Sequence, residues 1–318
     1  NTAVGYNSLY DNTTGHKNEA FGAYSLATNT TGANNTASGY GAMYSNTTAH
    51  CNTAFGSCAL FANTTGNHNT AVGVKSLKAT TTGESNAAIG TFSGYSLTTG
   101  CSNVAVGRSA LQSTSSGGYN VAVGKSSLLN STTASRNTAV GGCSLQANTT
   151  GTDLVGVGFK SLVANTCGKL NTASGAYTML SNTTGGCNTA YGYGSLHDNT
   201  TGGNNVAVGA CAAFNNTTAI NNVAVGVKAL FQNTTATQNT GVGMFSLQNT
   251  STGGNNTGLG YGTLYSNSTG TNNIALGACS LYANTTGAGN TAVGYLSMCH
   301  NTCGNNNTAV GLYALRAN

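Results

Sequence analysis

Residues 1–17 of the chain read NTAVGYNSLYDNTTGHK, and residues 18–34, NEAFGAYSLATNTTGAN, are a near copy of them. The same unit continues without insertion or deletion through all 318 residues, as 18 full units of 17 residues and 12 residues of another. Its consensus is N-T-A-V-G-x-x-S-L-x-x-N-T-T-G-x-x, and positions 1 to 17 refer to it below. A fixed period of this kind indicates a repeat architecture and therefore decides the fold.

Several positions of the unit hardly vary along the chain, and we interpret them as structural. Position 5 is Gly in all 19 copies, and position 1 is Asn in all copies except that of Leu154. Positions 4 and 9 carry most of the large apolar residues. The first residues assigned to these structural positions are Gly5, Gly22, Gly39, Asn1, Asn18, Val4 and Leu9.

The period and the composition predict an all-β parallel β-solenoid (a β-roll) with one coil per 17-residue repeat. Seventeen residues are too few for a helical repeat or a propeller blade, and the abundant Gly, Asn, Thr and Ser disfavour helix. We expect two short strands in each coil, at positions 2–5 and 7–10, followed by a turn that contains NTTG. Stacking in register would place Asn over Asn and Thr over Thr, where they can hydrogen-bond along the axis.

The interior of such a coil is thin, because only positions 4 and 9 supply a large apolar side chain in nearly every coil. Alternation along a strand puts positions 2 and 4 on one side and positions 3 and 5, which are Ala and Gly, on the other. Two interpretations of the bare Ala and Gly side remain open. It lines a narrow interior, or it packs closely against another copy of the chain in a homotrimer or filament.

The motifs SNVAVGRSAL (102–111), NNVAVGVKAL (221–230) and NNIALGACSL (272–281) carry a family resemblance. They resemble the N-S-V-A-I-G-x-x-S repeats in the heads of trimeric autotransporter adhesins. The longer NTAVG…SL…NTTG form is similar to repeats of phage tail-fibre-like and bacterial surface proteins. The resemblance to such NTAVG-type repeat fibre proteins covers the whole chain, and it implies a left-handed β-roll with three chains together. The 17-residue period and the NTTG turn depart from the adhesin heads.

Residues 1–318 read as a single continuous repeat domain, since neither a linker nor a composition shift interrupts the repeat. The pattern contains no atypical capping repeat, which predicts a segment of a longer fibre or ends covered by other subunits. No apolar run reaches the length of a membrane-spanning helix, so we expect no membrane insertion. The net charge is +5, but Lys and Arg are scattered, which argues against a nucleic-acid partner.

The sequence offers no convergent catalytic group, and we expect neither enzyme activity nor a cofactor. The five acidic residues form no repeated pair. His50, Cys51 and His68 lie in the turns of neighbouring coils, where variable surface residues are a simpler interpretation than a metal site. The ten cysteines show no fixed spacing, and Cys299–Cys303 is the best intrachain disulfide candidate.

The NTTG turn raises two further hypotheses. Thr and Ser at positions 13 and 14 could form the ladder of an ice-binding solenoid, although hydrogen bonding at the corner explains them more simply. The same turn spells N-x-[ST], which gives acceptors for glycosylation only in an exporting host with the machinery. These possible glycosylation sites are Asn12, Asn29, Asn46, Asn63, Asn148, Asn182, Asn199, Asn216, Asn233, Asn267 and Asn284.

A chain that repeats one coil specifies length, stiffness and a regular surface rather than a unique pocket. We therefore expect a structural protein of an extracellular fibre, either a cell-surface appendage or adhesin or, alternatively, a virion tail fibre. Self-association is the expected partner mode, and a glycan or cell-surface ligand would contact variable positions 6, 7 and 10. Aromatic residues at these positions include Tyr6, Tyr10, Tyr44, Phe61, Tyr193, Phe214, Phe231, Tyr265 and Tyr282.

Overall fold

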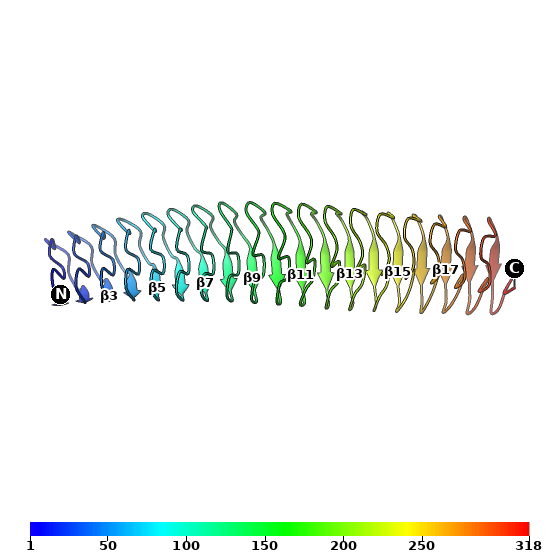
Figure 1. Ribbon diagram of the computed structural model, residues 1–318, viewed down its shortest axis with the longest axis horizontal. Coiled ribbons are helices and arrows are strands. Elements are labelled where there is room, and N and C mark those ends of the chain that lie inside the picture. The colour runs from blue at the N-terminus through cyan, green and yellow to red at the C-terminus, as the bar shows by residue number, and fades with distance from the viewer. Residues whose placement is uncertain (318) are drawn as a thin grey trace. The chain divides into compact units, whose positions relative to one another are not determined.

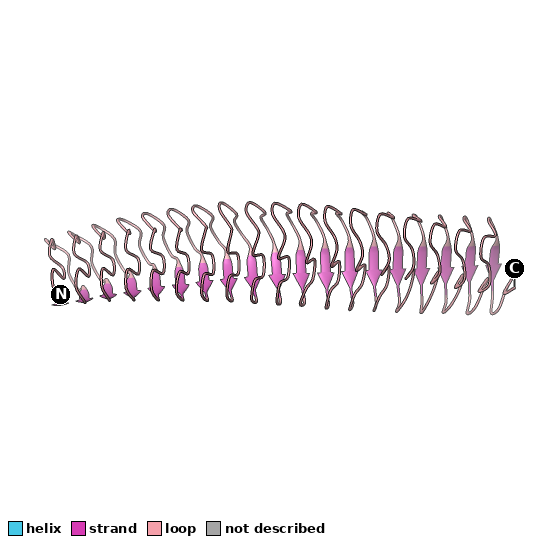
Figure 2. Ribbon diagram, in the orientation of Figure 1, coloured by secondary structure: helices cyan, strands magenta, loops and turns pink. Residues whose placement is uncertain are grey.

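The protein is an all-β parallel β-solenoid of about 18 turns, as the repeat predicted. A computed structural model describes residues 1–317. These residues form no helix, and hence none that is long and apolar enough to span a membrane. Each 17-residue coil holds one strand of three residues at positions 2–4, and turns and bends make up the rest of the coil (Figure 2).

The chain divides into two compact units, Asn1–Phe159 and Lys160–Asn318. The strands of the first unit are β1 (Thr2–Val4), β2 (Glu19–Phe21), β3 (Thr36–Ser38), β4 (Thr53–Phe55), β5 (Thr70–Val72), β6 (Ala87–Ile89), β7 (Val104–Val106), β8 (Val121–Val123), β9 (Thr138–Val140) and β10 (Val155–Val157). Those of the second unit are β11 (Thr172–Ser174), β12 (Thr189–Tyr191), β13 (Val206–Val208), β14 (Val223–Val225), β15 (Thr240–Val242), β16 (Thr257–Leu259), β17 (Ile274–Leu276), β18 (Thr291–Val293) and β19 (Thr308–Val310).

Within each unit, consecutive strands pair in parallel and in register (Figure 1). In the first pair, for example, Thr2 lies opposite Glu19 and Ala3 opposite Ala20. Equal repeat positions therefore lie next to each other from coil to coil. Each 17-residue repeat of the sequence therefore forms one coil of the stack.

Position 3 of each strand points into the coil. Ala20 is fully buried, and so is Leu26 at position 9. Position 3 packs against positions 8 and 9 of the preceding coil, because a Cβ added at Gly156 would meet Ser144 Oγ and Leu145 Cγ at 2.7 and 3.2 Å. The Ala side of the strand therefore lines a narrow interior, and the interpretation of this side as a contact between chains was wrong.

Position 4 faces outward, so its prediction as a core position was also wrong. Val4 is 58% exposed, and Ile89, well inside the first unit, is 47% exposed. The reason is the alternation of side chains, because a strand whose middle residue points inward must turn its third residue outward. Position 9 supplies the large apolar side chains of the interior; Leu9 itself, in the first coil, is half-buried, whereas Leu26 is fully buried.

Positions 7–10 form no second strand, contrary to the prediction. Positions 7 and 9 have left-handed backbone, with φ of +61° at Tyr24 and +50° at Leu26, and a strand requires negative φ. This conformation costs a non-glycine residue about 1–2 kcal/mol. Hydrogen bonds between coils offset that cost: Leu26 donates its N–H to the Ala42 carbonyl at 3.0 Å.

The glycines of position 5 line up along each unit, as predicted. The N–H of Gly22 donates to the Val4 carbonyl, and that of Gly39 to the Phe21 carbonyl, each at 2.8 Å. Their φ angles lie between +113° and +140°, a region that only glycine adopts without strain. A Cβ on Gly22 would also lie 2.7 Å from the Gly39 carbonyl oxygen, so the next coil leaves no room for a side chain.

Candidate functional site

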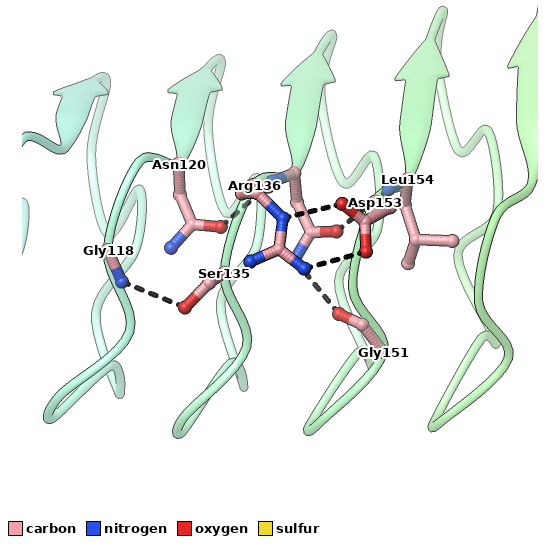
Figure 3. Close-up of polar contacts among 8 residues, drawn as sticks. Gly118, Asn120, Ser135, Arg136, Gly151, Asp153 and Leu154 are labelled. Carbon is pink, nitrogen blue, oxygen red and sulfur yellow. Dashed lines mark hydrogen bonds and ion pairs between the residues drawn. The ribbon is translucent and has the colours of Figure 1, made fainter.

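The asparagines of position 1 form a hydrogen-bonded ladder inside the solenoid (Figure 3). Asn120 donates its backbone N–H to Asn103 Oδ1 at 3.0 Å and its Nδ2 to the Ala134 carbonyl at 2.9 Å. Its own Oδ1 accepts the N–H of Asn137 at 3.1 Å. Asn1 and Asn18 begin the ladder in the same way, with Asn18 N–H donating to Asn1 Oδ1 at 2.8 Å. Stacked amides therefore satisfy backbone groups that would otherwise be buried without partners.

The asparagines of position 12 form a second ladder at the corner. Asn199 Nδ2 donates to Asn182 Oδ1 at 2.7 Å and to the Gly202 carbonyl at 3.0 Å. Asn216 Nδ2 donates in turn to Asn199 Oδ1 at 2.7 Å. The predicted stacking of Asn over Asn is confirmed by both ladders.

The second ladder contains all the predicted glycosylation acceptors. Ten of the eleven asparagines are fully buried, and Asn12, in the first coil, is half-buried. The amide nitrogen that would carry a glycan is a hydrogen-bond donor in the corner, as in the 3.0 Å bond from Asn12 Nδ2 to the Gly15 carbonyl. The hydrogen bonding of the turn therefore explains the Asn-x-Thr motif. In the folded coil these amides are not accessible to a glycosylating enzyme.

The position-12 ladder is interrupted in the first unit, where four consecutive coils lack asparagine. Thr80, Leu97, Thr114 and Ser131 occupy the position. The hydroxyl oxygens of the two threonines and the serine are buried without hydrogen-bond partners, and so is Asn63 Oδ1, next to the interruption. Each such buried polar atom costs about 1–3 kcal/mol relative to a satisfied one.

We expect Thr80→Asn to raise the free energy of unfolding by about 1–2 kcal/mol. The new Nδ2 would donate to Asn63 Oδ1 and to the Gly83 carbonyl, as Asn63 Nδ2 does to Asn46 Oδ1 and the Gly66 carbonyl at 3.1 and 2.9 Å. Urea unfolding followed by circular dichroism measures the change.

Thr114→Asn is the matched control for this experiment. The preceding coil has Leu97 at position 12, which cannot accept a hydrogen bond from the new amide. We expect a smaller gain than at Thr80, and equal gains for the two variants would contradict the ladder as the source of the stabilisation.

The threonines of position 13 also hydrogen-bond along the corner. Thr13 Oγ1 donates to the Thr30 carbonyl at 3.0 Å, and Thr30 Oγ1 to the Thr47 carbonyl at 3.1 Å. These position-13 hydroxyl hydrogens are therefore used in bonds within the solenoid. The predicted corner hydrogen bonding is confirmed.

The scattered polar residues have local partners. His50 Nδ1 accepts the Ala33 N–H at 2.9 Å, and Arg136 pairs with Asp153 one coil further on, with 2.6 Å between Nε and Oδ1 (Figure 3). The hydrogen bond to Asp153 raises the pKa of Arg136, but an exposed pair of this kind adds little stability. Residues 1–317 contain no group of three or more His, Cys, Asp or Glu side chains that could hold a metal ion. All ten cysteines are free thiols, so the Cys299–Cys303 bridge is not formed.

The outward strand positions create an exposed apolar face on each unit, which we call the outer face. It consists of the side chains at positions 2 and 4, and many are large and apolar. Monomeric proteins rarely leave extended apolar patches in water, and such patches mark contact surfaces. The exposed apolar residues of the outer face include Val4, Phe21, Phe55, Ile89, Val104 and Val140 in the first unit and Tyr191, Val208, Val242, Leu259, Ile274 and Val310 in the second.

An aromatic cleft lies on the first unit, where side chains of three consecutive coils meet. It has a volume of about 430 Å³ and is lined by Tyr24, Tyr40, Gly41, Tyr44 and Phe61. The Tyr44 and Phe61 rings stack with centroids 5.1 Å apart and planes 8° apart, and Tyr24 meets Tyr40 edge to face at 5.9 Å. Tyr40 is 58% exposed, so the cleft opens to solvent.

Glycine at position 7 of the middle coil makes room for the stacked rings. A Cβ on Gly41 would lie 3.3 Å from the Phe61 ring, a tight contact that would displace the ring. The backbone itself does not require glycine here, because Lys75 at the same position of another coil has φ of +55°, against +60° at Gly41. The aromatic ring, rather than the turn, therefore explains this glycine.

The same arrangement occurs twice in the second unit. Each copy extends over three consecutive coils. The first coil has an aromatic residue at position 7, and the second has Tyr-Gly at positions 6 and 7 and an aromatic residue at position 10. The third has Cys at position 7 and an aromatic residue at position 10. We call the three copies, residues 24–61, 177–214 and 245–282, the aromatic modules. The stacked pairs in the second and third modules are His197–Phe214 (4.4 Å) and Tyr265–Tyr282 (4.9 Å), and the edge-to-face pairs are Tyr177–Tyr193 (5.8 Å) and Phe245–Tyr261 (5.9 Å).

The sequence prediction found part of these modules. Six of its aromatic contact residues belong to them, and Tyr6 and Phe231 add a ring one coil beyond the first and second modules, at 5.4 Å from Tyr24 and from Phe214. Tyr10 is 72% exposed and belongs to no module. The prediction included Tyr193 but missed the other edge-to-face partners, which are Tyr24, Tyr40, Tyr177, Phe245 and Tyr261. A Tyr-Gly pair followed by Cys one period later is the signal that would have found them.

Three of the residues that line the first cleft are tyrosines, each with a polar hydroxyl. Within residues 1–317, no hydrogen bond involves the hydroxyls of Tyr24, Tyr40 and Tyr44. Partial burial, and then the neighbouring tyrosines, raises the pKa of Tyr24. Burial likewise raises the pKa of Cys279 in the third module, which keeps that thiol in its weakly reactive neutral form.

No protein-family model matches the chain, and no curated protein matches its sequence.

Proposed function

We propose that the protein is a structural element of an extracellular fibre and that copies of the chain associate through the outer face. The observation that carries this proposal is the exposed apolar row at positions 2 and 4, with Phe55 45% and Ile89 47% exposed inside the first unit. Water disfavours such a row, and a second copy would cover it. The ladders inside the coil hold adjacent coils together, so the residues available for contact with another copy are those of the outer face.

The regular interior supports a mechanical rather than a catalytic role. The buried amides of both ladders are used in hydrogen bonds between coils. Under this proposal the protein lies on a cell surface or, as the alternative, on a virion as a tail fibre. The expected assembly is a homotrimer or a filament, without cofactor, nucleic acid or membrane insertion.

The double variant Phe55→Lys/Ile89→Lys is expected to dissociate the assembly while leaving the coils folded. Both side chains point away from the interior, so lysine meets no steric conflict in the chain itself, but it places charge in an apolar contact. Sedimentation or native mass spectrometry should show the loss of the multimer, and circular dichroism should be unchanged.

Tyr119→Lys is the control, because Tyr119 is 69% exposed at position 17, away from the outer face. It should leave the particle mass unchanged. An unsubstituted chain that is a stable monomer in dilute buffer would overturn the proposed assembly.

A further inference from the structure

We propose that the three aromatic modules are binding sites for a neutral saccharide, each taking a sugar ring of a surface glycan. The inference deepens the proposed function, because it says where a fibre would make its contact and with what chemistry. It rests on features of the modules themselves, and these can be tested separately from assembly.

The first argument is the shape of the site. In the first module a stacked ring pair, Tyr44 and Phe61, and an edge-to-face pair, Tyr24 and Tyr40, surround an open volume of about 430 Å³. Ligand sites are typically concave and aromatic, with a few polar groups that fix orientation. A volume at the low end of the usual range fits one or two sugar rings rather than a protein domain.

The second argument is the chemistry of the lining. A sugar ring has an apolar C–H face, which packs on an aromatic ring, and hydroxyl groups around its edge. The Tyr24, Tyr40 and Tyr44 hydroxyls make no hydrogen bond within residues 1–317 and can donate to or accept from such hydroxyls. Aromatic rings with a polar tip are suited to a ligand of this mixed character.

The third argument is charge. Residues 24–61 contain no Asp, Glu, Lys or Arg, and neither do residues 245–282. The second module has one acid, Asp198, whose Oδ1 lies 2.6 Å from His197 Nδ1. A nucleic acid would need cationic partners for its phosphates, which the modules do not supply. A neutral ligand is therefore favoured.

The fourth argument is the recurrence of a glycine that the backbone does not need. An added Cβ would lie within 3.6 Å of the position-10 ring of the next coil at Gly41, Gly194 and Gly262 alike. The three modules thus keep the same flat ring floor at the same place in the coil. Three equivalent sites on one chain would give avidity for a repetitive glycan.

The test titrates the full chain with three neutral probes, cellohexaose, maltohexaose and chitohexaose, by calorimetry and tyrosine fluorescence, since the chain contains no Trp. At least one probe should bind with three sites per chain. Tyr40→Ala, Tyr193→Ala and Tyr261→Ala should each weaken one site by roughly 5- to 150-fold, because a stacking surface is lost. Each variant would then titrate with two sites of unchanged affinity and one weakened site.

Two controls accompany these variants. Tyr119→Ala removes an exposed ring outside the modules and should leave three sites. Gly41→Ala keeps every aromatic ring but pushes a methyl group against the Phe61 ring, and should weaken the first site alone. Circular dichroism verifies that each variant remains folded.

Three outcomes would overturn the inference. One is the absence of binding to all three probes. Another is equal binding of heparin with strong salt dependence, which would indicate ionic contact. The third is a change of particle mass in the tyrosine variants without a change in saccharide binding, which would make the modules contacts between copies. Saccharide binding by a Phe55→Lys/Ile89→Lys chain that has lost its multimer would separate this inference from the assembly proposal.

Discussion

Gly107→Val is expected to prevent folding of the coils around it. Gly107 has φ of +128°, and a Cβ there would lie 2.7 Å from the Gly124 carbonyl oxygen. A branched side chain therefore meets both a forbidden backbone conformation and the backbone of the next coil. We expect a loss of several kcal/mol in the free energy of unfolding, and aggregated or protease-sensitive protein on expression. Limited proteolysis and circular dichroism measure both effects.

Lys125→Val is the matched control for Gly107→Val. Lys125 is the exposed residue that follows Gly124, at position 6. The same valine there should leave fold and assembly intact. If the Lys125 change abolished assembly and Gly107→Val were tolerated, the structural and contact positions of the repeat would have been assigned the wrong way round.

Asn120→Asp is expected to have the second large effect, although it replaces a single NH₂ group by oxygen. Asn120 is fully buried, and its Nδ2 donates to Asn103 Oδ1 at 3.0 Å and to the Ala134 carbonyl at 2.9 Å. A carboxylate would face two acceptors without a hydrogen to donate. We expect the free energy of unfolding at pH 7 to fall by about 3 kcal/mol or more.

The effect of Asn120→Asp should depend on pH with a definite sign. A buried carboxyl group facing acceptors has a folded-state pKa raised above the unfolded value of about 3.9. The protonated acid can donate, so the variant should be least destabilised below about pH 4 and progressively worse as pH rises through the folded pKa. Urea unfolding at several pH values tests this. Asn130→Asp, at the exposed position 11, is the control and should show neither the loss nor this pH dependence.

The period of the sequence was sufficient to predict the solenoid, its register and its glycine row. Position 5 shows why: no residue other than glycine meets both the φ of Gly22 and its distance from the Gly39 carbonyl. The Asn and Thr ladders followed from the same reasoning, because in-register stacking brings like residues together.

The choice of inner and outer side could not be predicted in the same way. Alternation separates Ala20 from Phe21, but it does not say which of them the rest of the coil encloses. The second strand was mispredicted because Leu26 has a left-handed backbone conformation, which cannot be predicted for an ordinary apolar residue from the residue type. The coil is closed by hydrogen bonds to its neighbours, and these are not readable from local propensity.

The interruption of the position-12 ladder also makes the resistance to stretching uneven along the first unit. Around Asn199 in the second unit, amides at positions 1 and 12 bridge adjacent coils together with the backbone hydrogen bonds. Between Thr80 and Ser131 the position-12 amide bridges are missing, whereas the position-1 amides, such as Asn120 to Asn103, and the position-13 hydroxyls, such as Thr98 to the Ser115 carbonyl, still bridge the coils. When adjacent coils are pulled apart along the stack, fewer hydrogen bonds between coils share the load in this stretch than around Asn199. It is therefore the more compliant stretch, and if the chain serves as a fibre, as proposed above, this stretch is expected to extend first under load.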